Sequence, residues 1–294
     1  TYLIYWGYYL QTIEKFRPDM EGYFGAPFMS DEFKKRFGEW LSGWVAHLKK
    51  LGVFDSSYMF VFDETSHPDA LAALKLIKEV APEVRIYITI TTTSTLSDVA
   101  EAAPCLSAAQ PHFQTWQKND KFWRILKDNK VQIWPYYNVP PCSKIDEPYG
   151  TYRRMAWTSE SVGATGCGTW IHFYKADCAW EPPPMSLVYV KNPQVPKSLI
   201  GAPKELNNAD LVVPSKRWEA FREGVEDYFY RRQLAAAIEL AAKRGAAPEL
   251  RAEAEKFLAD SLAEVVGQPE RLDCADKQKA RTLDLLERMG KALR

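Results

Sequence analysis

The first two thirds of the chain alternate between short apolar runs and amphipathic stretches. The apolar runs are nearly continuous and rich in β-branched and aromatic residues, a pattern typical of parallel strands that are buried on both faces. We expect strands at residues 2–10, 58–63, 85–91, 106–112, 131–137 and 168–174.

The stretches between these runs have the spacing of amphipathic helices, and we expect helices at residues 31–51, 69–80 and 119–129. The first carries an apolar stripe of Phe33, Phe37, Trp40, Leu41, Trp44, Val45 and Leu48. Such alternation predicts a parallel α/β sheet or a (β/α)₈ barrel. No glycine-rich phosphate-binding loop follows any strand, which disfavours a nucleotide-binding sheet. We therefore predict a TIM-type barrel that lacks its first strands in this chain.

The last third is organised differently. Residues 176–214 contain seven prolines and predict a loop. Ser215 is a candidate N-cap for a helix with an apolar stripe of Trp218, Phe221, Val225, Tyr228 and Phe229. Further helices are expected up to Arg294, with breaks near 245–248 and 267–269. We assign residues 1–232 to the barrel catalytic domain and residues 233–294 to a C-terminal helical extension.

Charge and composition narrow the classes of partner. Lys plus Arg and Asp plus Glu both number 38, so the net charge is zero, which argues against nucleic acid and anionic membranes as partners. No apolar run is long enough to span a membrane. The five cysteines show neither a disulfide framework nor metal-ligand spacing, and pairing of Cys167 with Cys178 stays open. The chain begins inside an apolar run, so we expect an upstream segment with a signal peptide, and a secreted or periplasmic protein.

Two adjacent carboxylates follow the second predicted strand. Asp63 and Glu64 come directly after five mostly apolar residues, where a charge is costly unless it is paired or used. At the carboxyl end of a barrel strand they would lie in the active site, and so close a pair favours one ionised and one protonated group. The alternative is that they stabilise the N-terminus of the next helix.

Aromatic and amide side chains recur at the other strand ends. The chain contains 10 Trp and 13% aromatic residues, and aromatic faces stack on the C–H faces of sugar rings. The combination of stacking faces and hydrogen-bonding groups favours a carbohydrate pocket over a set of ordinary core residues. The candidate substrate-binding residues are Trp6, Tyr8, His112, Trp116, Trp134, Tyr136, Tyr137, Asn138, Trp170, His172, Tyr174 and Trp180.

The strand ending in Asp63-Glu64 resembles the catalytic strand of glycoside hydrolase family 123, the N-acetyl-β-galactosaminidases. Three other segments are similar to the same family: an aromatic strand, loop and Arg-containing helix within residues 133–157, a Gly- and Trp-rich strand from residue 166 to Trp180, and the helix that closes the barrel, residues 214–228. The resemblance covers residues 58–228. Thr65 follows the carboxylate pair, where related sequences tend to have proline.

The resemblance implies a retaining hydrolase that removes a terminal β-linked N-acetylhexosamine, expected to be N-acetylgalactosamine, from a glycan. The acetamido oxygen of the substrate would attack the anomeric carbon, Asp63 would orient that group, and Glu64 would act as acid and base. Neither a cofactor nor a metal is required, and a β-sandwich domain is expected upstream. The alternatives are a glycosidase of other specificity, with Asp177 or Glu181 taking part, and a barrel that binds carbohydrate without cleaving it.

Overall fold

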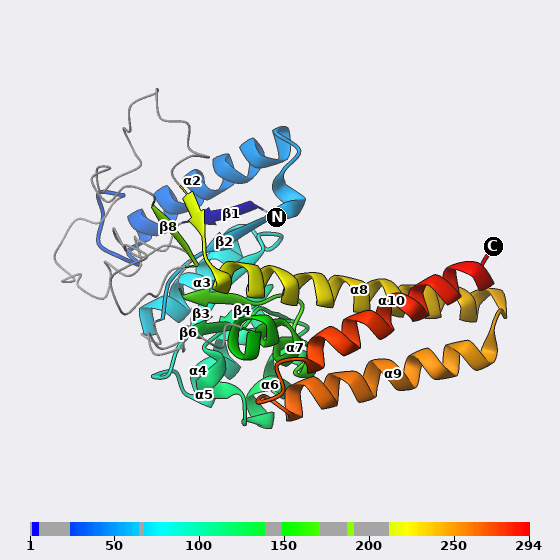
Figure 1. Ribbon diagram of the computed structural model, residues 1–294. Coiled ribbons are helices and arrows are strands. Elements are labelled where there is room, and N and C mark those ends of the chain that lie inside the picture. Colours follow the sequence, from blue (N-terminus) through cyan, green and yellow to red (C-terminus); the bar gives the residue numbers. More distant parts are fainter. Residues whose placement is uncertain (1, 6–23, 65–67, 139–148, 171–186, 191–211) are drawn as a thin grey trace, which may run out of the picture. The chain divides into compact units, whose positions relative to one another are not determined.

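The computed structural model describes residues 2–5, 24–64, 68–138, 149–170, 187–190 and 212–294. It is an α/β fold with a parallel sheet, and the chain divides into two compact units, Thr1–Tyr136 and Tyr137–Arg294. Figure 1 traces the elements along the chain. The expected domain boundary at residue 232 falls inside a helix that runs without a break from Lys216 to Arg244.

The first unit is built on a five-stranded sheet whose strands follow one another in sequence order. Every neighbouring pair is parallel, and the register places Tyr5 beside Phe60 and Thr89 beside Gln110. The strands are β1 (Tyr2–Tyr5), β2 (Ser57–Phe60), β3 (Ile86–Ile90), β4 (Ala108–Pro111) and β5 (Gln132–Ile133). A strand is thus confirmed in each of the first five ranges predicted from the sequence.

The strand expected at residues 131–137 divides into β5 and a second short strand, β6 (Tyr136–Asn138). The Trp134 amide still donates to Ala109 O at 2.9 Å, so the ladder with β4 continues through Trp134. Pro135 has no N–H to donate, and the ladder is interrupted there. An isolated parallel bridge between His112 and Tyr136 then places the start of β6 beside the end of β4.

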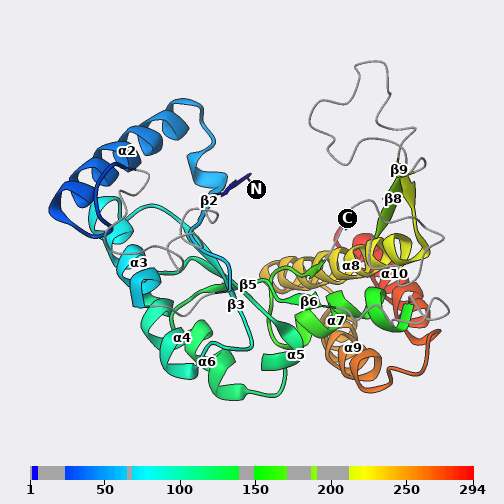
Figure 2. The same cartoon turned by 90° about the vertical axis from the view of Figure 1, so that its left-hand side faces the viewer.

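The helices of the first unit lie along one side of its sheet (Figure 2). Side chains cap the N-termini of α2, α4 and α6, where Ser30, Thr95 and Asn119 accept backbone N–H bonds. The helices are α2 (Asp31–Lys50), α3 (Pro68–Val80), α4 (Leu96–Ala102), the single turn α5 (Phe113–Trp116) and α6 (Asp120–Asp128), with 3₁₀ turns at Phe54–Ser56 and Ala103–Cys105. The three helices predicted from the sequence are confirmed.

Alternate residues of the sheet face the helices and the opposite side. Met59 lines a small cavity with Leu41, Val45 and Leu48 of α2, so it faces the helices. Its neighbours in β2 point the other way because strand side chains alternate. On that opposite side a second buried cluster is formed by Tyr58, Phe60, Tyr87 and Ala108, with Trp134 packed against it.

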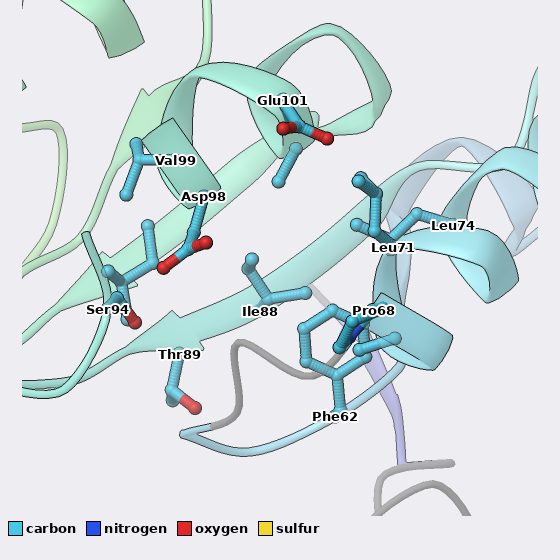
Figure 3. A pocket seen from close by; sticks show the side chains of 13 residues that line it. Phe62, Pro68, Leu71, Leu74, Ile88, Thr89, Ser94, Asp98, Val99 and Glu101 are labelled. Atoms are coloured by element: carbon cyan, nitrogen blue, oxygen red, sulfur yellow. The ribbon is translucent and has the colours of Figure 1, made fainter. Parts of the chain in front are cut away.

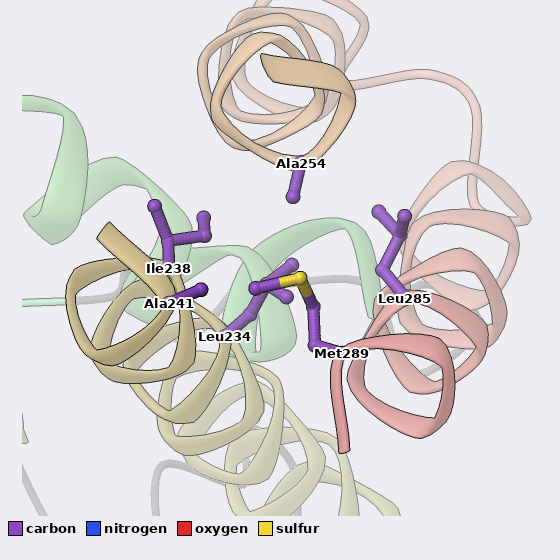
Figure 4. Close-up of a cluster of buried hydrophobic side chains, with 6 residues drawn as sticks. All are labelled: Leu234, Ile238, Ala241, Ala254, Leu285 and Met289. Carbon is purple, nitrogen blue, oxygen red and sulfur yellow. The ribbon is translucent and has the colours of Figure 1, made fainter. Parts of the chain in front are cut away.

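The second unit is mainly helical. A short helix and three long ones follow a π-helical turn (Tyr149–Arg153): α7 (Arg154–Ser161), then α8 (Lys216–Arg244), α9 (Pro248–Gly267) and α10 (Cys274–Ala292). The Ser215 cap and both expected breaks are confirmed. An apolar core holds the last three helices together (Figure 4), and it comprises Leu234, Ile238, Ala241, Ala254, Leu285 and Met289.

The residues that α8 buries are not those of the predicted stripe. Phe229 is 58% exposed, whereas Arg217, Asp227 and Arg231 are buried. The other four residues of the predicted stripe are half-buried. The most buried face of α8 packs instead on a polar network around Arg153, which hydrophobic periodicity does not detect.

Short strands complete the second unit. Gly168–Trp170 forms β7, which pairs with β6 and confirms a strand there. The expected loop at 176–214 contains two antiparallel strands instead, β8 (Val188–Val190) and β9 (Val212–Pro214). Cys105, Cys167 and Cys274 are free thiols, and Cys178 lies outside the described residues. No helix in the described part of the chain is long and apolar enough to cross a membrane.

Candidate active site

The predicted carboxylates lie where β2 ends. The strand and the next two residues, Val61 and Phe62, are buried, after which Asp63 is half-buried and Glu64 is exposed. Glu64 has a φ of 51°, in the left-handed region that residues other than glycine seldom adopt. The chain therefore leaves its extended path at this residue, so the two adjacent side chains are no longer bound to strict strand alternation.

A threonine of the neighbouring strand holds both residues. The Thr89 hydroxyl of β3 donates to Asp63 Oδ1 at 2.6 Å, and it accepts the Glu64 backbone N–H at 2.7 Å. Thr89 is 8% exposed and follows Ile88, which faces the opposite side of the strand (Figure 3). Thr89 was not predicted from the sequence, because threonine is common in strands and its presence in an apolar run indicates nothing more than a strand.

The Glu64 carboxylate accepts a hydrogen bond from the Tyr136 hydroxyl at the start of β6. Burial, and then the nearby Glu64 charge, raise the pKa of Tyr136 far above its ordinary value. The phenol consequently remains protonated at neutral pH and acts as a hydrogen-bond donor to the carboxylate.

His112 completes the group at the end of β4. Its ring lies edge-on to Tyr136, with centroids 5.2 Å apart, and its Nδ1 is 2.8 Å from Thr115 Oγ1. Burial lowers the pKa of His112 below its usual range, and the Glu64 charge opposes that shift. Four residues are thus assembled at one edge of the sheet: Glu64 after β2, Thr89 of β3, His112 after β4 and Tyr136 after β5.

Two of the predicted tryptophans of this unit pack into the protein. Trp116 is 6% exposed and stacks on Phe122 with ring centroids 4.1 Å apart. Its ring face is therefore not available to a sugar, contrary to the prediction that Trp116 binds substrate. The cause is the turn α5, which directs the indole toward α6. Trp134 lies 4.9 Å from Tyr58 and 5.6 Å from Tyr87 between ring centroids, within the aromatic cluster of the sheet.

The other predicted residues belong to the second unit or are not described. The Tyr137 hydroxyl is buried and bonds to Met155 O and Ser159 Oγ at 3.2 and 3.1 Å, the partners of a core tyrosine. Asn138 is exposed at the end of β6, and the backbone of Trp170 ends β7. The predicted residues outside the described part are Trp6, Tyr8, His172, Tyr174 and Trp180, and the alternative carboxylates Asp177 and Glu181 also lie there.

The arrangement can perform proton transfer. Glu64 presents a solvent-accessible carboxylate that is oriented by a protonated phenol, and Asp63 is held beside it as a hydrogen-bond acceptor. Among the described residues, no cluster of three or more His, Cys, Asp or Glu side chains is placed to hold a metal ion.

The fold and this site define an α/β protein with a polar, carboxylate-containing site at the carboxyl edge of a parallel sheet. No protein-family model matches the chain, and no curated protein matches it in sequence.

Proposed function

We propose that this protein is a glycoside hydrolase built on a TIM-type barrel, which removes a terminal β-linked N-acetylhexosamine, N-acetylgalactosamine in particular, by substrate-assisted retaining catalysis. The observation that carries the proposal is the separate anchoring of two consecutive carboxylates, Asp63 by Thr89 and Glu64 by Tyr136. Substrate assistance needs two carboxylates with different tasks in one place, because the nucleophile is the acetamido oxygen of the sugar itself.

Three features of the first unit support the barrel. Its strands are parallel and adjacent in sequence order, whereas doubly wound sheets reverse their order at a switch point. Its helices lie on one side of the sheet, as the outer ring of a barrel does (Figure 2). The opposite face carries large packed side chains, as a barrel interior does.

The roles follow from the anchoring. Glu64 is the exposed carboxylate, so it protonates the leaving oxygen and then activates water. Asp63 is less exposed and fixed by a short hydrogen bond, which suits a group that orients the acetamido N–H and stabilises the charge developing there. Tyr136 and neutral His112 are donors at the edge of the same site.

The test compares hydrolysis of nitrophenyl β-N-acetylgalactosaminide and nitrophenyl β-galactoside by the full-length gene product. We expect cleavage of the acetamido sugar only. Asp63→Asn should lower kcat by about 10²- to 10⁴-fold. Glu64→Gln should lower it more on an alkyl glycoside than on the nitrophenyl one, because nitrophenolate leaves without a proton. Glu79→Gln, an exposed change on α3, serves as the matched control.

Each other outcome removes part of the proposal. Cleavage of both sugars would discard the acetamido mechanism and leave a glycosidase of other specificity. Cleavage of neither sugar by a folded protein that still binds them would identify a barrel that binds carbohydrate without hydrolysing it. Full activity of Glu64→Gln on the alkyl glycoside would remove Glu64 from the acid role.

A further inference from the structure

Thr89 uses its single hydroxyl for two different bonds. A threonine hydroxyl has one proton to donate and lone pairs that accept, and here the proton goes to Asp63 Oδ1 while the oxygen accepts the Glu64 N–H. The two bonds, at 2.6 and 2.7 Å, connect the side chain of one carboxylate residue to the backbone of the next.

The bond to the Glu64 amide falls where the backbone is least favourable. Glu64 is in the left-handed region, which a residue with a Cβ adopts only when its surroundings hold it there. A change of this φ would move the Glu64 carboxylate away from Tyr136, since the direction of the side chain follows the backbone.

Thr89 is itself rigidly placed. It lies in β3 in register with Gln110 of β4, and it is 8% exposed. A β-branched side chain in a strand has restricted rotation about χ1, so its hydroxyl direction is well defined. Figure 3 shows the side chains of Ile88 and Thr89 on opposite sides of β3, beside a cavity that both residues line together with Phe62, Leu71 and Val99.

We propose that Thr89 is a positioning residue that sets the directions of both Asp63 and Glu64. This inference rests on the proposed function, in which the two carboxylates act on the substrate. Thr89 has no contact with substrate in this role. Thr89 keeps the turn after β2 in one backbone conformation. In that conformation the Asp63 carboxylate faces the Thr89 hydroxyl, and the Glu64 carboxylate faces the Tyr136 hydroxyl.

The test compares Thr89→Val, which keeps the shape and removes the hydroxyl, with Thr89→Ser, which keeps the hydroxyl. We expect Thr89→Val to lower kcat by about 10- to 100-fold with KM nearly unchanged, because misplaced catalytic groups slow the chemical step more than they weaken binding. Thr89→Ser should recover most of the activity. A retained thermal transition shows that both variants are folded, and Thr89→Ala replaces Thr89→Val if the latter is not.

A second readout is independent of catalysis. Hydrogen exchange of the Glu64 amide, followed by NMR, should be at least about 10-fold faster in Thr89→Val than in the wild type or Thr89→Ser, because the amide loses its acceptor. Unchanged exchange would overturn the proposal even if the wild type hydrolysed no glycoside. Faster exchange in Thr89→Val together with a wild-type kcat would show that the bond forms but does not position the carboxylates. That result would also overturn the proposal. A wild type without activity but with the expected exchange pattern would refute the proposed function alone.

Discussion

Two opposing effects set the protonation of His112. Partial burial disfavours the imidazolium ion and lowers the pKa of the ring, and the Glu64 charge works against that shift. Because burial is the larger effect, the folded protein binds a proton at His112 less readily than the unfolded chain does. Stability from this group is therefore present above the ordinary histidine pKa of about 6.5, and it is lost as the pH falls through the lower value of the folded state.

Titration by NMR can separate the two effects. We expect the His112 pKa in the wild type to lie below 6.5, the value for an unperturbed ring. Glu64→Gln should lower it further, because the favourable negative charge is removed while burial is unchanged. The resonance is assigned by its loss in His112→Asn. A pKa that rises in Glu64→Gln would contradict the placement of the carboxylate near the ring.

Among single residues, the sequence predicted candidate side chains but not the contacts that hold them. Asp63 and Glu64 were candidates because a charge after a buried strand is costly unless it is paired or used, and His112 and Tyr136 because they lie in the last part of neighbouring predicted strands. The structure brings Glu64, His112 and Tyr136 together. Thr89 could not be found, since its role depends on the register of β3 and on a backbone conformation at Glu64. Trp116 and Tyr137 resemble site residues in sequence, but their packing is decided by neighbours that are not adjacent in sequence.

Among the elements, α8 shows what periodicity can and cannot establish. Its start at Ser215 and its end before Gly245 follow from local chemistry, a side-chain cap and a left-handed glycine at φ 65°. The buried face of α8 does not follow from local chemistry, because it is determined by packing against α7, α9 and α10. At Gly224 the backbone of α8 approaches that of Arg153 so closely that an added Cβ would lie 2.2 Å from Arg153 O.

A pair of glycine substitutions tests this close approach. Gly224→Ala should destabilise the protein by about 1–3 kcal/mol or more, because the added methyl meets backbone that can move only with the whole turn. A Cβ added at Gly290 in α10 would meet open space, so Gly290→Ala should stabilise the protein by about 0.5–1 kcal/mol through helix propensity. Urea denaturation measures both. Equal effects of the two substitutions would rule out a tight contact at Gly224.

For the whole molecule, the alternation of apolar runs and amphipathic stretches predicted the α/β class with a parallel sheet, whereas a division into two units after Tyr136 was not expected. The predicted boundary separated the last helices from a barrel, but α8 continues through it and packs with α7, α9 and α10. The reason is chemical. The second unit is joined by buried ion pairs that connect residues far apart in sequence, and such pairs leave no periodic signal.

Arg153 is the centre of that network. Its guanidinium is 1% exposed and bonds to Asp227 at 2.8 and 3.2 Å and to Asp276 at 2.5 Å, and it also lies 3.1 Å from Glu223. Asp227 in turn accepts the Trp157 indole N–H at 3.1 Å. One residue therefore joins α8 and α10 to the turn that precedes α7. A second buried arginine, Arg231, binds Glu160 of α7 and Ser261 of α9.

Removal of one partner from a buried ion pair is costly because it leaves the other charge without compensation. We expect Arg153→Met to destabilise the second unit by about 3–5 kcal/mol. Arg222→Met, at a 43% exposed arginine that pairs with Glu219 and Glu226 on the same helix, should cost far less, because solvent screens these exposed pairs. Hydrogen exchange by mass spectrometry locates the effect. Faster exchange confined to α7, α8 and α10 would identify the second unit as a separate cooperative body. An equal increase in β2, β3 and β4 would show instead that the two units unfold together, and a single stability would then apply to the whole chain.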